Sequence, residues 1–333
     1  MSRIVKQKIA MKKISVSTTK IFQHVIIIIF LCMINCIPSK ANIVLNDEEQ
    51  AVIGRWDMTI DMHGKSSPSW LDIHRSGIST LVGEFVGSGG SARPISKIYF
   101  NNNRINFSIP PQWEKDTNNI SFAAELKNDS LFGTMIATNG EKYNWVAARA
   151  PSLKRTAEPA WQKPVTLFNG KDLKGWHATG DNQWIVKEEV LSSPHSGSNL
   201  MTDETFNDFK LHIEFRYPEG SNSGVYLRGR YEVQIEASHG DEPPKDVFSA
   251  IYGFIAPSEM AANKAGEWQT YDITLIGRMV TVVANGKTVI CNREIPGITG
   301  GAINSNEGEP GPILLQGDHG PIDYRNIVIT PAQ

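Results

Sequence analysis

Residues 225–236 read VYLRGRYEVQIE, and their side chains alternate between apolar and polar types along the whole stretch. The apolar positions, interrupted only at Gly229, are Val225, Leu227, Tyr231, Val233 and Ile235. The polar positions are Tyr226, Arg228, Arg230, Glu232, Gln234 and Glu236. Because successive side chains of a strand point to opposite faces, the pattern predicts one long strand with an apolar face and a charged face.

The charged face has two interpretations. Its cations, carboxylates and amide stand about 6.6 Å apart along a strand, which is the reach of a sugar ring and its substituents. A ladder of salt bridges on a solvated strand is the alternative. The spacing alone favours neither.

Residues 54–149 contain eight short alternating runs, separated by turn signals such as Asn139-Gly140. The runs cover residues 55–61, 69–74, 79–86, 95–100, 104–109, 120–126, 131–138 and 143–148. Eight strands with tight connections predict a small up-and-down β-barrel over residues 42–150. The start Gly54-Arg55-Trp56 resembles the Gly-x-Trp opening of lipocalin-like barrels. No convergent catalytic set stands out in this part of the sequence, so an accessory or positioning domain is expected.

Residues 151–164 include Pro151, Pro159 and Pro164, which predict an extended linker. Short alternating runs return over residues 165–331, with longer connections between them. Asn285-Gly286 has the composition of a two-residue hairpin turn. Many short strands joined by long connections favour a two-sheet jelly roll of the concanavalin type. The predicted fold class is therefore all-β in both parts.

The N-terminal residues have the pattern of a secretory signal. Residues 1–41 carry seven of the 33 Lys and Arg residues and no acidic residue, and residues 25–34 form the apolar run VIIIIFLCMI. This run is short for a membrane span and suits a signal-peptide core, with cleavage expected after Ala41. We expect an exported protein that is periplasmic or cell-surface associated in a bacterium. A lipid anchor at Cys36 is the alternative.

Charge and cysteine content narrow the possible partners. The formal net charge is −2 and no basic cluster stands out, which argues against nucleic acid as a partner. Beyond the predicted signal peptide, Cys291 is the only cysteine, so an intramolecular disulfide and a cysteine-based metal site are excluded there. The sequence leaves the oligomeric state open.

Ordered motifs over residues 165–330 carry a family resemblance. They are LFNG at 167–170, NSG at 222–224, YEVQI at 231–235, IYG at 251–253, GEW at 266–268, GPILLQ at 311–316, HG at 319–320 and YRNI at 324–327. In this order they resemble the 3-keto-disaccharide hydrolase family of bacterial secreted proteins. Two departures are mild: Glu236 stands where the family usually has Asp, and Tyr324 where Phe is common.

The resemblance implies a glycoside already oxidised to a ketone at C3 of its sugar. We hypothesise that a base removes the C2 hydrogen, which the ketone acidifies, and that the C1 substituent then leaves by β-elimination. Water addition would complete a net hydrolysis. This route needs a base near C2, an electrophile or cation near the enolate oxygen, and an acid near the leaving oxygen.

Four residues are candidates for catalysis. Glu232, central on the charged face, is the expected base, with a structural salt bridge as the alternative. His319 lies in the polar, glycine-flanked segment QGDHG at 316–320, where a histidine has little packing reason to be. Glu236 is a second acid or base, or a metal ligand. Tyr252 is a proton donor or a stacking surface.

Other candidates bind the substrate or brace the site. Gln234 would hydrogen-bond sugar hydroxyls, and Arg228 would polarise the ketone unless it only balances the carboxylates. Trp268 is a sugar platform or a core residue, and Arg325 braces the site from the last strand. The expected substrate-binding set is completed by Asn222, Gln316 and Asp318.

The sequence does not decide whether the protein binds a metal ion. A divalent cation held by carboxylates and His319 would stabilise an enolate, and a structural calcium ion is also compatible with a jelly roll. No ligand motif identifies either ion. Metal-ligand spacing is also missing among His177, His195, His212 and His239.

Two functions of different classes follow. The first is an exported enzyme that cleaves 3-keto-glycosides, which requires Glu232 and His319 to lie near each other. The second is a non-catalytic carbohydrate-binding jelly roll, which is expected to expose aromatic side chains on a concave face with few ionisable groups. A carbohydrate is the expected partner in both.

Overall fold

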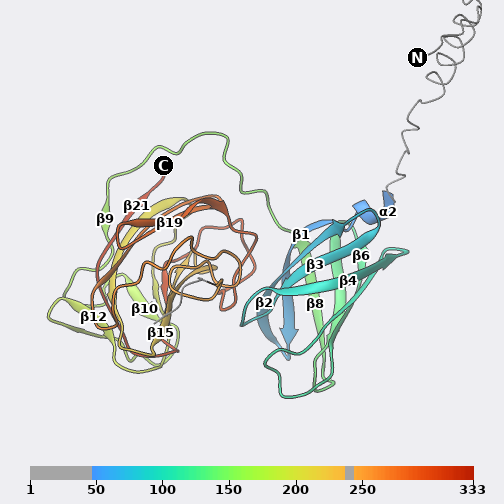
Figure 1. Cartoon of the computed structure of the whole chain (residues 1–333), viewed down its shortest axis with the longest axis horizontal. Helices are drawn as coiled ribbons and strands as arrows, with labels where there is room; N and C mark the ends of the chain where they lie inside the picture. Colours follow the sequence, from blue (N-terminus) through green and yellow to red (C-terminus); the bar gives the residue numbers. More distant parts are fainter. Residues whose placement is uncertain (1–46, 237–243) are drawn as a thin grey trace, which may run out of the picture. The chain divides into compact units, whose positions relative to one another are not determined.

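The computed structural model describes residues 47–236 and 244–333, and these described residues belong to one compact unit. The predicted signal peptide, Cys36 and His239 lie outside the described residues. An eight-stranded closed barrel is followed by two further sheets, which confirms the predicted all-β class of a small barrel and a two-sheet jelly roll (Figure 1). Within the described part of the chain, no helix has the length and apolar character to cross a membrane.

The barrel follows the short helix α2 (Asp47–Gln50) and closes because β1 pairs with both β2 and β8. Its antiparallel strands are β1 (Gly54–Met62), β2 (Lys65–Ser76), β3 (Thr80–Val86), β4 (Arg93–Asn101), β5 (Arg104–Ile109), β6 (Ile120–Lys127), β7 (Ser130–Ile136) and β8 (Lys142–Arg149). Phe122 stacks on Phe107 with ring centroids 4.6 Å apart and lies 4.8 Å from Phe85. Buried aromatic side chains therefore pack this core.

The jelly roll consists of a five-stranded and an eight-stranded sheet. The smaller sheet has the order β10 (Trp176–Ala178), β13 (Leu200–Thr202), β20 (Leu314–Leu315), β15 (Asn222–Leu227) and β16 (Tyr231–Glu236). The larger has the order β11 (Ile185–Lys187), β12 (Val190–Ser193), β21 (Ile322–Pro331), β14 (Phe209–Arg216), β17 (Gln269–Ile276), β18 (Met279–Ala284) and β19 (Lys287–Glu294), with β9 (Val165–Thr166) beside β21. The order is not sequential, so chain segments far apart in sequence meet within each sheet.

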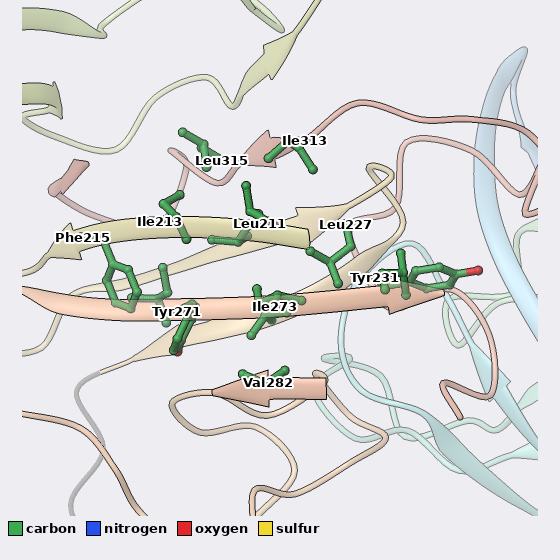
Figure 2. Close-up of a cluster of buried hydrophobic side chains, with 14 of the residues drawn as sticks. Leu211, Ile213, Phe215, Leu227, Tyr231, Tyr271, Ile273, Val282, Ile313 and Leu315 are labelled. Carbon is green, nitrogen blue, oxygen red and sulfur yellow. The ribbon is translucent and has the colours of Figure 1, made fainter. Parts of the chain in front are cut away.

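The jelly-roll core combines the apolar faces of both sheets (Figure 2). Every second residue of β14 is buried, which places Phe215 in this core. Its ring lies 4.6 Å from that of Tyr271 on β17. Leu227 and Tyr231 contribute from the smaller sheet. Full burial of such a side chain stabilises the fold by about 1.5–3 kcal/mol, so this cluster is a main source of stability.

The prediction of one long strand over residues 225–236 is wrong, because the chain reverses in the middle of it. β15 and β16 form an antiparallel hairpin in which Leu227 pairs with Tyr231. Arg228 and Gly229 have φ angles of 54° and 63°, and the Arg230 amide donates to the Leu227 carbonyl at 3.1 Å. Two consecutive positive φ angles are typical of a tight hairpin turn, and the glycine supplies one of them without strain.

The geometry of the reversal explains why the alternation still identified the two faces correctly. The connection of three residues, 228–230, is odd in length, so residues of equal parity still share a face after the turn. Val225 opposes Val233 on the buried face, and Tyr226 opposes Glu232 on the polar face. Simple alternation therefore identified the two faces but did not reveal the turn.

We expect Phe215→Ala to lower the free energy of unfolding by about 3–5 kcal/mol, because it leaves a cavity among packed aromatic rings. Urea unfolding followed by circular dichroism measures the change. Phe132→Ala is the matched control, since the Phe132 side chain is half exposed on the barrel. This variant should lose much less free energy of unfolding. Equal losses in the two variants would contradict this account of the core.

Candidate functional site

A pocket of about 280 Å³ opens over the polar face of the β15–β16 hairpin. Seven of the residues expected at the site line it: Asn222, Glu232, Gln234, Tyr252, Gln316, Asp318 and His319. They come from the hairpin and from connections that follow β16 and β20. The fold therefore brings together residues that are almost 100 positions apart in the sequence.

Glu232 is buried in this pocket, with only 3% of its surface exposed. The Tyr226 hydroxyl donates to its Oε2 at 2.8 Å. The Gln234 side-chain amide, oriented so that both of its polar atoms are satisfied, donates to Oε1 at 3.2 Å and to the Ser223 carbonyl at 3.0 Å. A Cβ at Gly224 would overlap Oε1, so the glycine provides the space that the carboxyl group occupies.

The surroundings of Glu232 favour its protonated form. Burial raises the pKa of Glu232 to about 8, the Tyr226 hydrogen bond opposes this shift, and the negative charge of Asp318 adds to it. Burial, followed by the charge of Glu232, raises the pKa of Tyr226 well above its usual value, so this hydroxyl remains a donor. A carboxyl group that titrates near neutral pH suits acid–base catalysis.

His319 and Asp318 form a pair at the exposed part of the lining. His319 Nδ1 lies 2.6 Å from Asp318 Oδ1, and both side chains are about half exposed. Such a hydrogen bond orients the imidazole ring, which leaves Nε2 available for a second partner. A buried carboxyl group and a solvent-accessible histidine thus line the same pocket.

Tyr252 is joined to the site through its backbone as well as its ring. Its amide donates to the Glu232 carbonyl at 3.1 Å. Burial raises the pKa of Tyr252, a hydrogen bond with the Ser91 side chain opposes the rise, and the nearby charge of Glu232 adds to it. The phenol is therefore a hydrogen-bond donor at neutral pH.

Gln316 offers an unused acceptor. The residue is buried, and its Oε1 has no hydrogen-bond partner among the described residues. A buried, unpaired carbonyl oxygen costs free energy that a ligand hydroxyl would offset. Its place in the pocket lining makes it suited to bind a sugar hydroxyl.

Arg228 does not lie on the polar face, because the hairpin turn takes it into the interior. Its side chain is fully buried and donates from Nη2 to the Tyr231 hydroxyl at 3.0 Å and to the Gly277 carbonyl at 2.8 Å. The expectation that Arg228 shares a strand face with Glu232 is therefore wrong. Glu236 ends β16 and is also outside the pocket lining, and burial raises its pKa.

Trp268 and Arg325 contact each other rather than the pocket. The Arg325 guanidinium lies 3.9 Å from the Trp268 ring centroid, and that of Arg216 lies 4.7 Å from it. Arg325 also donates to Glu214 at 2.7 Å. These residues belong to the larger sheet and the segment leading into it, so the structure does not bring them to Glu232.

Some lining residues were not selected from the sequence. Tyr226 is an even number of residues from Glu232, so the alternation already placed both on the polar face, and the two residues oppose each other in the hairpin. Gly300 and Gly301 also line the pocket, and a Cβ on either would overlap a neighbouring atom. Adjacent glycines of this kind indicate close approach of the backbone to another group, but they do not say to which group.

The described residues show no clustered metal ligands. Within residues 47–236 and 244–333, no group of three or more His, Cys, Asp and Glu side chains is arranged to hold a metal ion. Both carboxylate oxygens of Glu232 already accept hydrogen bonds. His177 and His195 are exposed and bond to Asp203 and to a backbone carbonyl, respectively.

The fold and the pocket define an all-β jelly-roll protein with a polar pocket on its smaller sheet, lined by a buried carboxyl group and a histidine. Residues 163–330, just over half of the 333-residue chain, match the 3-keto-α-glucoside-1,2-lyase-like domain family. The chain therefore belongs to this family, in agreement with the resemblance carried by its motifs.

Individual relatives are more distant. A 3-keto-disaccharide hydrolase of Bacteroides thetaiotaomicron is 28% identical over 30% of this chain, and the chain spans 40% of that protein's length. A candidate glycosyl hydrolase of Parabacteroides distasonis is 27% identical with a TM-score of 0.42, covering 55% of this chain and 96% of that one. The carbohydrate-binding module CBM66 of Bacillus subtilis is 12% identical with a TM-score of 0.34, covering 46% and 93%.

The raised pKa of Glu232 predicts a pH-dependent effect on stability. An unfolded glutamate has the ordinary value of 4.5, whereas the folded value is about 8. Between these values the folded protein holds a proton that the unfolded chain has released, so stability falls as the pH rises from about 4.5 and the loss is complete above about 8. The Gln side chain of Glu232→Gln does not titrate and lacks this loss.

We therefore expect the difference in Tm, Glu232→Gln minus wild type, to become more positive between pH 5 and pH 9. Thermal unfolding at matched ionic strength measures it. Glu267→Gln, at an exposed carboxylate outside the pocket, is the control and should show no comparable trend. A pH-independent difference for Glu232→Gln would contradict a folded-state pKa near 8.

Proposed function

We propose that this protein cleaves the glycosidic bond of 3-keto-glycosides by elimination followed by hydration. The observation that carries the proposal is the buried Glu232, whose pKa of about 8 suits proton transfer, in a polar pocket that His319 also lines. Membership of the 3-keto-α-glucoside-1,2-lyase-like family supports the substrate class. The relative named 3-keto-disaccharide hydrolase supports it further.

The first step uses Glu232 as the base. In its ionised form the carboxylate takes the C2 hydrogen, and the electron pair of the C2–H bond moves toward the C3 carbonyl to give an enolate. The pair then returns to form the C1–C2 double bond while the bond from C1 to the leaving oxygen breaks. Protonated His319 supplies a proton to that oxygen, which gives the free aglycone and an unsaturated 3-keto sugar.

The second step restores the protein. Water adds to C1 of the unsaturated ketone, neutral His319 accepts the proton that water loses, and Glu232 returns its proton to C2. The sum is one glycoside and one water converted to a 3-keto sugar and the aglycone. Glu232 and His319 end in their starting protonation states, so neither is consumed.

Neutral donors and acceptors support the substrate in this scheme. Negative charge develops on the C3 oxygen, and the Tyr252 hydroxyl and the side-chain amide of Asn222 are available donors in the lining. The unpaired Oε1 of Gln316 would accept from a sugar hydroxyl. The proposed chemistry uses the protein's own side chains. The signal-like residues 1–41 support action outside the cytoplasm.

We expect Glu232→Gln to lower the rate of p-nitrophenol release from its 3-keto-glucoside by about 10²–10⁴-fold, the usual contribution of a general base. For the wild type, kcat/KM should rise with pH and level off above about 8, since only ionised Glu232 acts as the base. Glu267→Gln is again the control. Parallel reactions with EDTA determine whether a metal takes part.

A folded wild type that released nothing from several 3-keto-glycosides, with and without added divalent metal, would contradict the proposed enzyme. The carbohydrate-binding module would then be the better assignment. Isothermal titration with unoxidised sugars would measure binding directly. Release that survives in Glu232→Gln would instead overturn the role given to this carboxyl group.

The role of His319 predicts a dependence on the leaving group. His319→Ala should slow release of an alkyl alcohol, which needs protonation, by at least about tenfold more than release of p-nitrophenol, which leaves readily as an anion. His177→Ala is the matched control, because His177 and Asp203 form a similar exposed pair outside the pocket, with Nδ1 2.7 Å from Oδ1. Equal slowing of both substrates would exclude His319 as the leaving-group acid.

A further inference from the structure

The loop of the barrel between β3 and β4, residues 87–92, reaches the pocket of the jelly roll. Ser88, Gly89 and Gly90 form part of the pocket lining together with Glu232. The Gly301 amide on the jelly-roll side donates to the Ser88 carbonyl at 3.0 Å. One wall of the site is therefore built by the part of the chain for which the sequence predicted only an accessory or positioning role.

The two sides approach so closely that glycines are required. A Cβ at Gly300 would overlap the backbone of Gly90. A Cβ at Gly253, the residue after Tyr252, would lie 2.8 Å from Ser91 Cα. Any larger residue at these jelly-roll positions would push the loop outward, so the chain is built to keep loop 87–92 in contact with the site.

The barrel also holds the loop from behind. Arg93, directly after the loop, is buried and pairs with Glu114 at 2.7 Å. Its guanidinium lies 4.9 Å from the centroid of the Trp113 ring. A Cβ at Gly90 would overlap that ring, which shows that Trp113 covers the outer side of the loop.

Shared packing places the barrel strands next to the jelly-roll core. Trp70 of β2 and Val86 of β3 are buried in the same apolar cluster as the jelly-roll residues. The Trp70 ring packs edge-to-face against the Phe254 ring, with the ring centroids 5.4 Å apart. Since Val86 directly precedes the loop, this packing sets where the loop begins.

We propose that loop 87–92 is a wall of the substrate site that limits the size of the 3-keto-glycoside accepted beside Glu232. The inference rests on the proposed function and assigns the barrel a role in specificity. The pocket of about 280 Å³ is small compared with typical ligand sites of about 300–1,000 Å³. Removing this wall would open the pocket on one side, and filling it would narrow the space for the sugar.

Gly89 is the position at which the wall is tested. Its φ angle is outside the left-handed region, and no atom lies within 4 Å of an added Cβ, so its backbone tolerates a side chain. The series Gly89→Ala, Gly89→Val and Gly89→Tyr therefore fills space at the lining in graded steps. Ser79→Tyr is the control, because Ser79 is exposed in the connection at the opposite end of β3.

We expect kcat/KM for p-nitrophenyl 3-keto-glucoside to fall in the order Ala, Val, Tyr, reaching a loss of about tenfold or more for Gly89→Tyr. Methyl 3-keto-glucoside should lose less at each step because its aglycone is smaller. The Tm of the variants should stay near that of the wild type. Ser79→Tyr should match the wild type with both substrates.

Binding gives a readout that is independent of turnover. Titration calorimetry of methyl 3-keto-glucoside with Glu232→Gln and with Glu232→Gln/Gly89→Tyr should show weaker binding to the second. If the wild type cleaves both glycosides and the Gly89 series cleaves them equally well, loop 87–92 is not a wall of the site, while the proposed function stands. If the wild type neither cleaves nor binds them, the proposed function fails and this inference fails with it.

Discussion

The turn at Arg228 and Gly229 is the constraint on which both the fold and the site depend. It sends β16 back along β15. The alternate apolar side chains of both strands then face the core, and the polar side chains between them line the pocket. A buried network holds the turn: Arg228 donates to the Tyr231 hydroxyl, which donates to Glu307 at 2.7 Å. Glu307 in turn pairs with Arg278 at 2.5 Å. Removing either Glu307 or Arg278 would leave the other charge buried and unpaired, which is strongly destabilising.

This network extends to the barrel through Asp57 of β1. Burial, and next the negative charge of Glu307, raise the pKa of Asp57 to about 8. Burial also acts to raise the pKa of Glu307, but the hydrogen bond and the charge of Arg278 oppose it and keep this pKa below its usual value. One carboxyl group is therefore protonated and the other ionised near neutral pH, which lets the first donate to the second. The barrel thus contacts the jelly roll both beneath the turn and at the pocket.

The sequence predicted the elements better than their mutual placement. The eight barrel runs and the jelly-roll strands follow local alternation, which depends only on which side chains face the core. Glu232, Gln234 and His319 were identifiable because their residue types are costly to bury or unusual in a turn. Arg228 was misplaced because an odd-length turn leaves alternation intact. The loop at 87–92 was missed because its contact with Gly300 is long-range, and no local pattern encodes it.

The position of Glu232 illustrates why a functional site departs from local rules. A carboxyl group inside a strand pair costs free energy to ionise, and Gly224 weakens the strand opposite it. The same two features create a titratable group in a space that a ligand can enter. The surrounding core offsets this cost: the apolar side chains of Val225, Val233 and Ile235 are fully buried behind the polar face. A strand whose one face is buried in a continuous core tolerates an unfavourable residue on its other face. The alternation of apolar and polar residues over 225–236 reflects these two faces.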